Sequence, residues 1–183
     1  MLLDQESGLL GGVEFHCSPN HDERPTIDDI SGIVIHNISL PPGEFGGGWI
    51  DDLFLNKLDP SAHPYFEEIS DLRVSAHILI RRSGELIQYV PFHKRAWHAG
   101  VSCWDGRERC NDFTIGIEME GCDEQCFAEQ QYQQLADVIK TLCASYPELN
   151  TESVKGHQDI APDRKTDPGP HFNWSYLAEL LES

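Results

Sequence analysis

Gly32-Ile33-Val34-Ile35-His36 is the strongest indication of the fold in this chain. Three of its residues are β-branched and almost no polar residue interrupts it, which predicts a strand buried on both faces. The run ends where polar residues begin, so we expect His36 to lie at the C-terminal end of this strand. The segment thus joins the core of a sheet directly to a side chain that can carry chemistry.

A second strand is predicted over residues 114–120, because apolar and other residues alternate there without a break. Alternation with a period of two places successive side chains on opposite faces of a sheet. One face is suited to packing, and we expect the other to be exposed and able to hold functional groups. The packing face carries Ile115, Ile117 and Met119, and the other face carries Thr114, Gly116, Glu118 and Glu120.

The remaining patterns predict a hairpin and several helices. Strand-like runs over 75–80 and 85–90 flank a turn that ends in Gly84. Helical spacing of apolar residues is clearest over 129–146, before Pro147. Shorter helices are predicted over 49–58, 63–69 and 174–181, with Asn173 as the N-cap of the last.

This order of elements predicts a mixed α/β or α+β fold, with a central mixed β-sheet flanked by helices. The chain has 183 residues, and no repeat or flexible linker divides it. We therefore expect residues 1–183 to form one domain with one active site.

The charge of the chain narrows its possible partners. It carries 31 acidic and 13 basic residues, for a formal net charge of −18. Such a field repels nucleic acids and anionic membrane surfaces, and no apolar run is long enough to span a bilayer. We expect no nucleic acid, no membrane and no obligatory protein partner.

The N-terminal residues lack the basic and apolar stretches of a secretory signal peptide, which predicts a cytoplasmic protein. In that compartment the six cysteines are expected to be reduced thiols. Cys122 and Cys126 have a spacing that would suit a metal site, but the other cysteines do not supply the second pair that a structural zinc site usually needs.

Histidine and aspartate residues offer a better metal site. A catalytic zinc in a hydrolase commonly has two histidine ligands and one carboxylate ligand, with one position left open. His36 ends the buried strand, and His157 lies in a polar, proline-rich segment over 156–170. The same segment holds three candidate carboxylates, and spacing alone does not choose among them: Asp159, Asp163 and Asp167. With nine histidines in the chain, any single one could instead be structural.

Five segments carry a close resemblance to a known family. They are residues 34–46 (VIHNISLPPGEFG), 72–77 (LRVSAH), 94–102 (KRAWHAGVS), 106–113 (GRERCNDF) and 157–170 (HQDIAPDRKTDPGP). Together they resemble the type-2 N-acetylmuramoyl-L-alanine amidases, and in particular the cytoplasmic members from Gram-negative bacteria that act on 1,6-anhydro-muropeptides. The resemblance runs from about His16 to Leu177. It implies a mixed sheet with helices around it, the fold shared with T7-type lysozyme amidases and peptidoglycan recognition proteins.

The resemblance also implies roles for individual residues. His36, His157 and Asp167 match the zinc ligands, which leaves Asp159 and Asp163 as candidates to support the metal-bound imidazoles. Glu118 matches the catalytic acid and base, and Lys165 matches the residue that stabilises the oxyanion. The residues that match the substrate groove are Asn37, Arg73, Ala96, Trp97 and Arg109.

Arg73 and Arg109 suit an anionic peptide, because a guanidinium group binds a carboxylate through two hydrogen bonds. Either arginine could instead form a surface ion pair of little consequence. His77 is expected to be structural, and His98 is expected to line the groove without binding the metal.

The function implied is hydrolysis of the amide between the lactyl group of the muramyl sugar and L-alanine during recycling of cell-wall fragments, with an indirect effect on β-lactamase induction. Two alternatives belong to other classes. A peptidoglycan recognition module would bind without cutting, and usually lacks the full ligand set. An amidase of polymeric wall would be expected to carry an export signal or a wall-binding domain.

Overall fold

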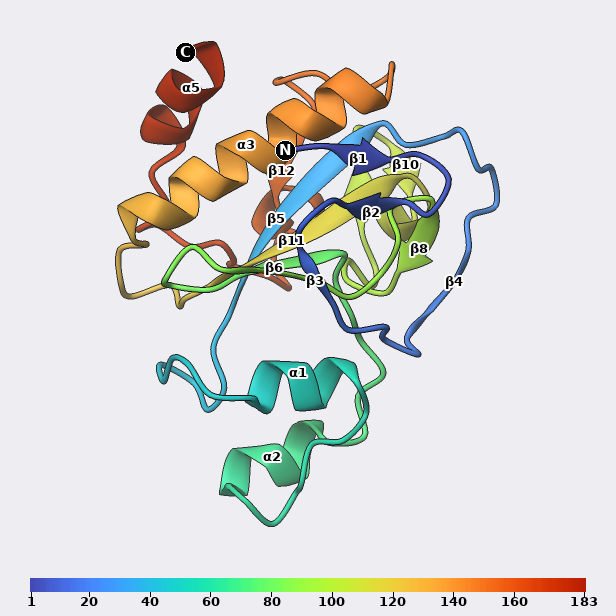
Figure 1. The fold of residues 1–183 in the computed structure, drawn as a ribbon. Coiled ribbons are helices and arrows are strands. Elements are labelled where there is room, and N and C mark those ends of the chain that lie inside the picture. The colour runs from blue at the N-terminus through green and yellow to red at the C-terminus, as the bar shows by residue number, and fades with distance from the viewer.

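A six-stranded mixed sheet lies at the centre of the molecule, with helices on both sides of it (Figure 1). The computed structural model describes all residues from 1 to 183. The strands, in their order across the sheet, are β12 (Val154–Gly156), β5 (Gly32–Ile38), β11 (Thr114–Glu120), β6 (Ile78–Ile80), β7 (Leu86–Gln88) and β3 (Glu14–Phe15). The predicted fold class is confirmed.

Strand β5 is the centre of the parallel part of the sheet. It pairs in parallel with β11 on one side and with β12 on the other, and β11 pairs in parallel with β6. The first five residues of β5 are all buried, as the sequence predicts for a strand covered on both faces. The strand continues two residues past His36, to Ile38, so this histidine lies within the strand.

The predicted hairpin consists of β6 and β7, which pair antiparallel. In the turn between them Gly84 has a φ of 85°, a conformation that favours glycine. Its backbone N–H donates to the carbonyl of Arg81 over 2.8 Å. Both strands are shorter than predicted, because only residues 78–80 and 86–88 pair with each other.

Several elements are too short to be recognised from a sequence pattern. Six very short strands form three small antiparallel pairs, β1 with β2, β4 with β8 and β9 with β10, and a 3-10 turn precedes β11. Their bounds are β1 (Leu3–Asp4), β2 (Leu9–Leu10), β4 (His21–Glu23), β8 (Lys94–Ala96), β9 (Cys103–Trp104), β10 (Arg107–Glu108) and η1 (Cys110–Asp112).

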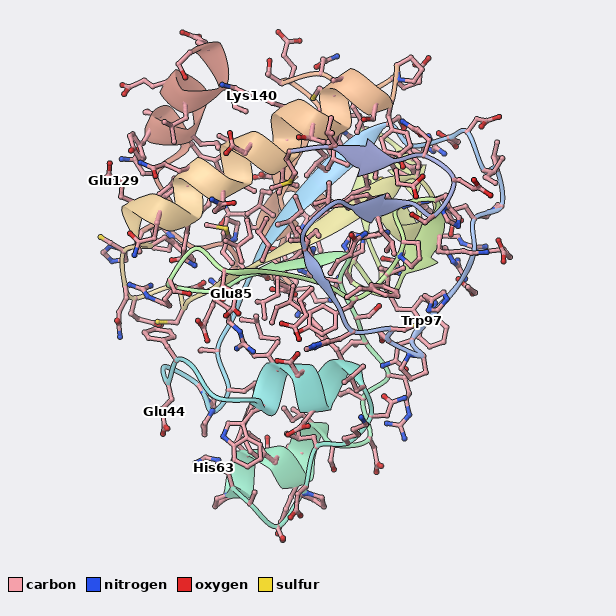
Figure 2. The ribbon with its side chains drawn as sticks, viewed as in Figure 1. Glu44, His63, Glu85, Trp97, Glu129 and Lys140 are labelled. Carbon is pink, nitrogen blue, oxygen red and sulfur yellow. The ribbon has the colours of Figure 1, made fainter.

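The main core lies between one face of the sheet and the helices α3 (Glu129–Ser145) and α5 (Trp174–Glu182). Ile115, Ile117 and Met119 of β11 face this core, as their alternation predicts. Exposed side chains such as those of Glu129 and Lys140 lie at the outer surface of α3 (Figure 2). No helix combines the length and the apolar character that crossing a bilayer requires.

Both helices begin and end near the predicted residues. The side chain of Asn173 accepts a hydrogen bond of 3.0 Å from the backbone N–H of Tyr176, which confirms its role as the N-cap of α5. Helix α3 starts at Glu129 and stops just before Pro147, whose ring would clash with a continuing helix.

Two short helices, α1 (Trp49–Phe54) and α2 (Pro64–Ile69), cover the other face of the sheet near β6 and β7 (Figure 1). Their buried residues pack in a second apolar cluster, which includes Phe54, Phe66 and Leu79. Helix α1 is shorter than predicted because Asn56 has a φ of 58°, which no α-helix can continue. Pro64 occupies the first turn of α2, where its fixed φ favours the start of a helix.

The polar face of β11 is buried, which contradicts the expected exposure. Glu120 is only 2% exposed. Its carboxylate forms an ion pair with Arg81 at 3.3 Å and accepts the backbone N–H groups of Gly46 at 2.7 Å and Arg82 at 2.9 Å. Arg81 also pairs with Asp51 of α1. Glu120 is therefore a structural residue that ties the loop before α1 to the sheet.

This arrangement predicts that Glu120→Gln destabilises the protein by about 2–4 kcal/mol, because a buried ion pair is lost and an amide N–H₂ must face N–H donors. Glu23→Gln makes the same chemical change at an exposed ion pair with Lys94 and should leave the stability almost unchanged. Chemical denaturation of both variants measures the difference. Equal effects would show that the Glu120 network does not stabilise the fold.

Candidate metal centre and active site

The strand register places two histidines level with each other. Gly156 of β12 lies opposite Ile35 of β5, so the next residues along the two parallel strands, His157 and His36, are neighbours. His157 begins α4 (His157–Ile160), a single helical turn within the segment predicted as a loop. The backbone N–H of Gln158 donates to the carbonyl of Asp167 over 2.9 Å, which holds the aspartate beside both imidazoles.

Three ligand-type atoms therefore converge. The Nδ1 atoms of His36 and His157 lie 2.9 Å apart, and each is 3.0 Å from Oδ2 of Asp167. Two ligands of a tetrahedral zinc, each about 2.1 Å from the ion, lie about 3.4 Å apart, so side-chain shifts of about 0.4 Å would admit the ion. The two-histidine, one-carboxylate donor set fits zinc, and the group is suited to hold a metal ion.

Burial and mutual contact set the charges of these groups. Burial lowers the pKa of His36 to about 4, so its imidazole is neutral at pH 7. Burial alone would raise the pKa of Asp167, but hydrogen bonds from His157 and His36 outweigh it and hold that pKa well below its ordinary value. A neutral imidazole and an ionised carboxylate are the forms that bind a metal.

The ring nitrogens that face away from the cluster also have partners. Nε2 of His36 lies 2.9 Å from Nδ1 of His98, and Nε2 of His157 lies 3.1 Å from the carbonyl of Ala99. Asp159 does not take this role, since its carboxylate accepts the backbone N–H of Gly156 at 2.7 Å. Asp163 has no contact with either imidazole. The support expected from these two aspartates comes instead from the 98–99 segment.

Glu118 lies beside the cluster because β11 pairs with β5 so that Glu118 is opposite His36. It is 9% exposed, which again differs from the expected exposed position. Its Oε2 atom is buried without a hydrogen-bond partner. Burial raises the pKa of Glu118 well above its ordinary value, and the nearby carboxylate of Asp167 adds to the increase. A buried, unpartnered carboxyl in a cleft is the kind of group that enzymes use for proton transfer.

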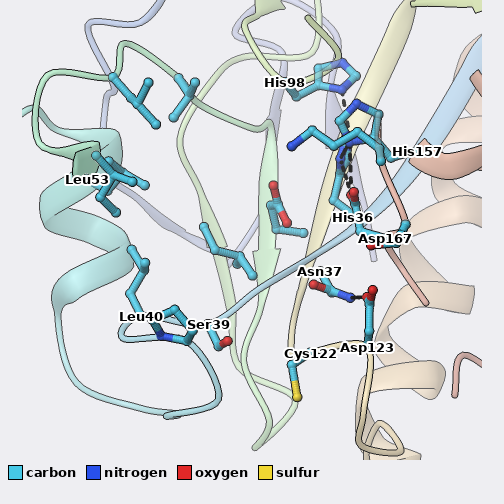
Figure 3. A pocket seen from close by; sticks show the side chains of 18 of the residues that line it. His36, Asn37, Ser39, Leu40, Leu53, His98, Cys122, Asp123, His157 and Asp167 are labelled. Atoms are coloured by element: carbon cyan, nitrogen blue, oxygen red, sulfur yellow. Dashed lines mark hydrogen bonds and ion pairs between the residues drawn. The ribbon is translucent and has the colours of Figure 1, made fainter. Parts of the chain in front are cut away.

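A cavity of about 680 Å³ opens over these residues (Figure 3). Its polar end contains the cluster and Glu118, and its apolar end is formed by side chains such as Leu40, Leu53 and Tyr65. Its size and mixed lining suit a ligand with both a sugar-like polar part and apolar groups.

Two of the residues predicted for a substrate groove line this cavity. Asn37 donates to Oδ1 of Asp123 over 2.7 Å (Figure 3). It also donates to the carbonyl of Pro168 over 3.1 Å. Trp97 donates from Nε1 to Asp22 over 3.2 Å. Their side chains are thus held in place before any ligand binds.

The other three lie outside the cavity lining. Ala96 is fully buried in the second apolar cluster. Arg73 is exposed and donates to the carbonyls of Ser70 and Leu72. Arg109 is 70% exposed and pairs with Asp112 at 3.2 Å.

The segment before Asp167 brings two cations to the cavity. Lys165 is exposed, and its side chain lines the cavity on the same wall as Asp167. Arg164 donates to the carbonyls of Ala99 and Val101 over 2.6 and 2.7 Å. Arg164 was not predicted as a site residue, although it lies within the segment 157–170.

All six cysteines are free. Cys122 lines the cavity, whereas Cys126 lies 3.8 Å from Nδ1 of His171 on the exposed surface. These two cysteines do not form a metal site of their own. His77 is buried and structural, as expected, because Gly116 donates to its Nδ1 over 3.0 Å and its Nε2 lies 3.1 Å from the carbonyl of Lys94.

Comparison with protein families identifies the class to which this site belongs. The model of the N-acetylmuramoyl-L-alanine amidase family (Amidase_2) matches residues 26–170, which contain every side chain of the metal cluster as well as Glu118. The chain belongs to this amidase family. It is therefore a hydrolase of amide bonds, which confirms the resemblance inferred from its sequence segments.

Curated amidases are similar over nearly the whole chain. The 1,6-anhydro-N-acetylmuramyl-L-alanine amidase AmpD of Escherichia coli K12 is 60% identical over 181 residues, which cover 99% of this chain and 97% of that protein. AmpD of Citrobacter freundii is 58% identical over 99% of this chain and 95% of its own length.

Solved amidase structures share the fold. A crystal structure of a selenomethionine AmpD derivative superposes with a TM-score of 0.95 at 57% identity and covers 99% of both chains. The E. coli amidase AmiD, in complex with anhydro-N-acetylmuramic acid-L-Ala-D-γ-Glu-L-Lys, has a TM-score of 0.60 at 33% identity, covering 83% of this chain and 57% of AmiD.

The buried carboxyl of this amidase predicts a trade between stability and function. A carboxyl with a higher pKa in the folded than in the unfolded state destabilises the fold at neutral pH, and that cost disappears as pH falls toward its ordinary value of 4.5. Glu118→Gln should therefore raise the melting temperature of chelator-treated protein at pH 8, by about 2–4 °C for each kcal/mol relieved.

The gain should be smaller at pH 5.5, where the folded state of the wild type already keeps part of this proton. Melting curves at both pH values, with Glu120→Gln as the matched variant that loses stability, provide the measurement. A Glu118→Gln protein less stable than the wild type at pH 8 would contradict the assignment of a strained, unpartnered carboxylate.

Proposed function

We propose that this protein is a zinc-dependent amidase that hydrolyses the bond between the lactyl group of a 1,6-anhydro-muramyl sugar and L-alanine. The observation that carries the proposal is the convergence of His36, His157 and Asp167 next to the unpartnered carboxyl of Glu118. The names of the AmpD relatives, which are similar over almost the entire chain, support the substrate. In this proposal residues 1–183 act as one catalytic unit.

His36, His157 and Asp167 would hold the zinc ion. When bound, zinc supplies a Lewis acid that polarises the scissile carbonyl and makes water acidic enough to react near neutral pH. The protein orients these ligands before the metal arrives, since each side chain is already fixed by the sheet, by α4 or by a hydrogen bond. Such orientation lowers the entropy lost when the site is assembled.

Glu118 moves the protons of the reaction. Its Oε2 atom would accept a proton from the attacking water and then deliver it to the nitrogen of L-alanine, which must be protonated to leave. The raised pKa of Glu118 suits both steps, because a carboxyl with a pKa nearer to neutrality can both accept and return a proton. Its place opposite His36 puts it within the same cavity as the reacting bond.

Lys165 would stabilise the negative charge that develops on the carbonyl oxygen. Its side chain lines the cavity two residues before Asp167, and no carboxylate forms an ion pair with it. An ammonium group aimed at a developing oxyanion contributes most where water is largely excluded. Arg164, by contrast, is engaged with the carbonyls of Ala99 and Val101 and would act by holding this wall in place.

The substrate would lie along the cavity. Asn37 and Trp97 line it and would contact the ligand directly. Arg73 and Arg109 lie outside the lining but are exposed, so we propose that they attract the peptide carboxylates to an otherwise acidic protein. Ala96 is buried, and its role would be to position the neighbouring Trp97.

We place this reaction in the cytoplasm, where recycled wall fragments are the available substrates. Accumulation of uncut fragments would then be the link to β-lactamase induction. Both statements rest on the resemblance to the AmpD amidases. The net charge of −18 supports the absence of a nucleic-acid partner.

Glu118→Ala should abolish release of the peptide from anhydro-muropeptide while leaving one zinc per chain, because Glu118 moves protons and does not hold the metal. His157→Ala should lose both zinc and turnover, since it removes a ligand. Zinc content by atomic emission and peptide release by mass spectrometry check both variants.

The matched variant for these measurements is Glu124→Ala, which removes a carboxylate that also lines the cavity but is not part of the metal cluster. It should retain zinc and most of the turnover. Loss of zinc in Glu118→Ala would show that this residue is a ligand, and full turnover by zinc-free wild type would reject the proposed mechanism.

A further inference from the structure

A chain of polar contacts leads away from the proposed metal site into the interior. Nε2 of His36 lies 2.9 Å from Nδ1 of His98, and Nε2 of His98 lies 3.3 Å from Oγ1 of Thr114. The hydroxyl of Thr114 then donates to the carbonyl oxygen of Cys110 over 2.7 Å. None of these contacts involves a carboxylate, and the chain ends on a group that can only accept.

In the zinc-loaded protein, where Nδ1 of His36 would face the metal and not donate to Asp167, that end point fixes the direction of the remaining hydrogen bonds. Because a carbonyl has no proton to give, the single hydroxyl proton of Thr114 is used on Cys110, and Oγ1 can only accept from Nε2–H of His98. A neutral imidazole protonated at Nε2 has a lone pair at Nδ1, so His98 accepts from Nε2–H of His36. The Nδ1 atom of His36 is then left with a lone pair, and this atom faces Asp167 and His157.

We propose that His98 and Thr114 are positioning residues that hold His36 in the tautomer whose Nδ1 can bind the metal. The proposal rests on the zinc amidase function proposed above. Neither residue contacts the atoms of the three ligands that face the metal position. Both act through Nε2 of His36. Outer partners of this kind tune metal affinity as well as ligand orientation.

The missing side chain of Gly116 in β11 makes room for the ring of His98. Gly116 lies between Thr114 and Glu118 on the same face of β11, and a Cβ atom at Gly116 would approach Cγ of His98 to 2.4 Å. The imidazole can therefore lie against the strand only because residue 116 is glycine. Asn111 holds the backbone beneath it, accepting the N–H groups of His98 at 3.1 Å and Ala99 at 2.7 Å.

The two proposed histidine ligands are thus controlled in different ways. The outer nitrogen of His157 lies 3.1 Å from the carbonyl of Ala99 and 3.3 Å from the guanidinium of Arg164, with no side chain between them. The outer nitrogen of His36 is connected to a carbonyl, that of Cys110, only through the side chains of His98 and Thr114. Its tautomer should therefore be sensitive to changes at Thr114, which is fully buried and lies outside the cavity lining.

Thr114→Val and Thr114→Ser form a matched pair that tests the relay. Valine keeps the shape of threonine but removes the acceptor for His98, whereas serine keeps the hydroxyl. We expect zinc affinity, measured by competition with a chromogenic chelator, to fall about tenfold in Thr114→Val, within the range found for outer-partner mutations. The zinc affinity of Thr114→Ser should remain within about threefold of that of the wild type, a smaller change than outer-partner mutations usually cause.

The tautomers themselves give a second readout that needs no variant. In ¹⁵N-histidine-labelled, zinc-loaded protein, long-range ¹H–¹⁵N spectra should show His98 protonated at Nε2 and unprotonated at Nδ1. A merely structural role for His98 would not require that tautomer. Protonation of His98 at Nδ1 would overturn the proposal, and so would wild-type zinc affinity in a folded Thr114→Val protein.

These outcomes are separate from a failure of the proposed function. If the wild type bound no zinc, or cleaved without it, the function would be rejected and the relay with it. If the wild type bound zinc and cleaved the substrate, but Thr114→Val and the tautomer of His98 behaved otherwise than expected, only the relay would be rejected.

Discussion

The parallel pairing of β5 with both of its neighbours is the constraint on which the site depends. Parallel strands carry their side chains in step, so a residue on one strand has a fixed neighbour on the next. Pairing with β11 puts Glu118 beside His36, and pairing with β12 brings His157 level with it. A one-residue slip in either pair would turn a required side chain to the opposite face.

The same strand shows how stability and chemistry share one face of the sheet. Glu120 is buried with an arginine and two backbone donors, so its charge is compensated. Glu118, two residues earlier, is buried with one oxygen unpartnered and a raised pKa. The fold therefore tolerates one uncompensated carboxyl, at the position where a proton must be accepted and returned.

Patterns that depend on neighbouring residues could be read from the sequence. The β-branched run that ends in His36, the alternation over 114–120 and the helix before Pro147 are all present in the structure. The strands of two or three residues could not be predicted, because they are formed by distant pairing and carry no period of their own. Burial of Glu118 and Glu120 was missed for a related reason, since the segments that cover them come from elsewhere in the chain.

The candidate site was only partly accessible from residue types. Two histidines and a carboxylate were expected, but spacing left three aspartates open, and the resemblance favoured Asp167. The fold brings that aspartate to both imidazoles and directs Asp159 to a backbone N–H. The contact between His98 and His36 had no sequence signal except Gly116, whose missing side chain makes room for the ring.

Turnover on two matched substrates tests the proposed zinc amidase function. Zinc-loaded protein would be given a 1,6-anhydro-muramyl peptide and the same peptide on the non-anhydro sugar, with released peptide measured over time. We expect zinc-dependent release of a peptide that begins with L-alanine, and faster release from the anhydro sugar. Release at the same rate after zinc is removed, or cleavage at another bond, would contradict it.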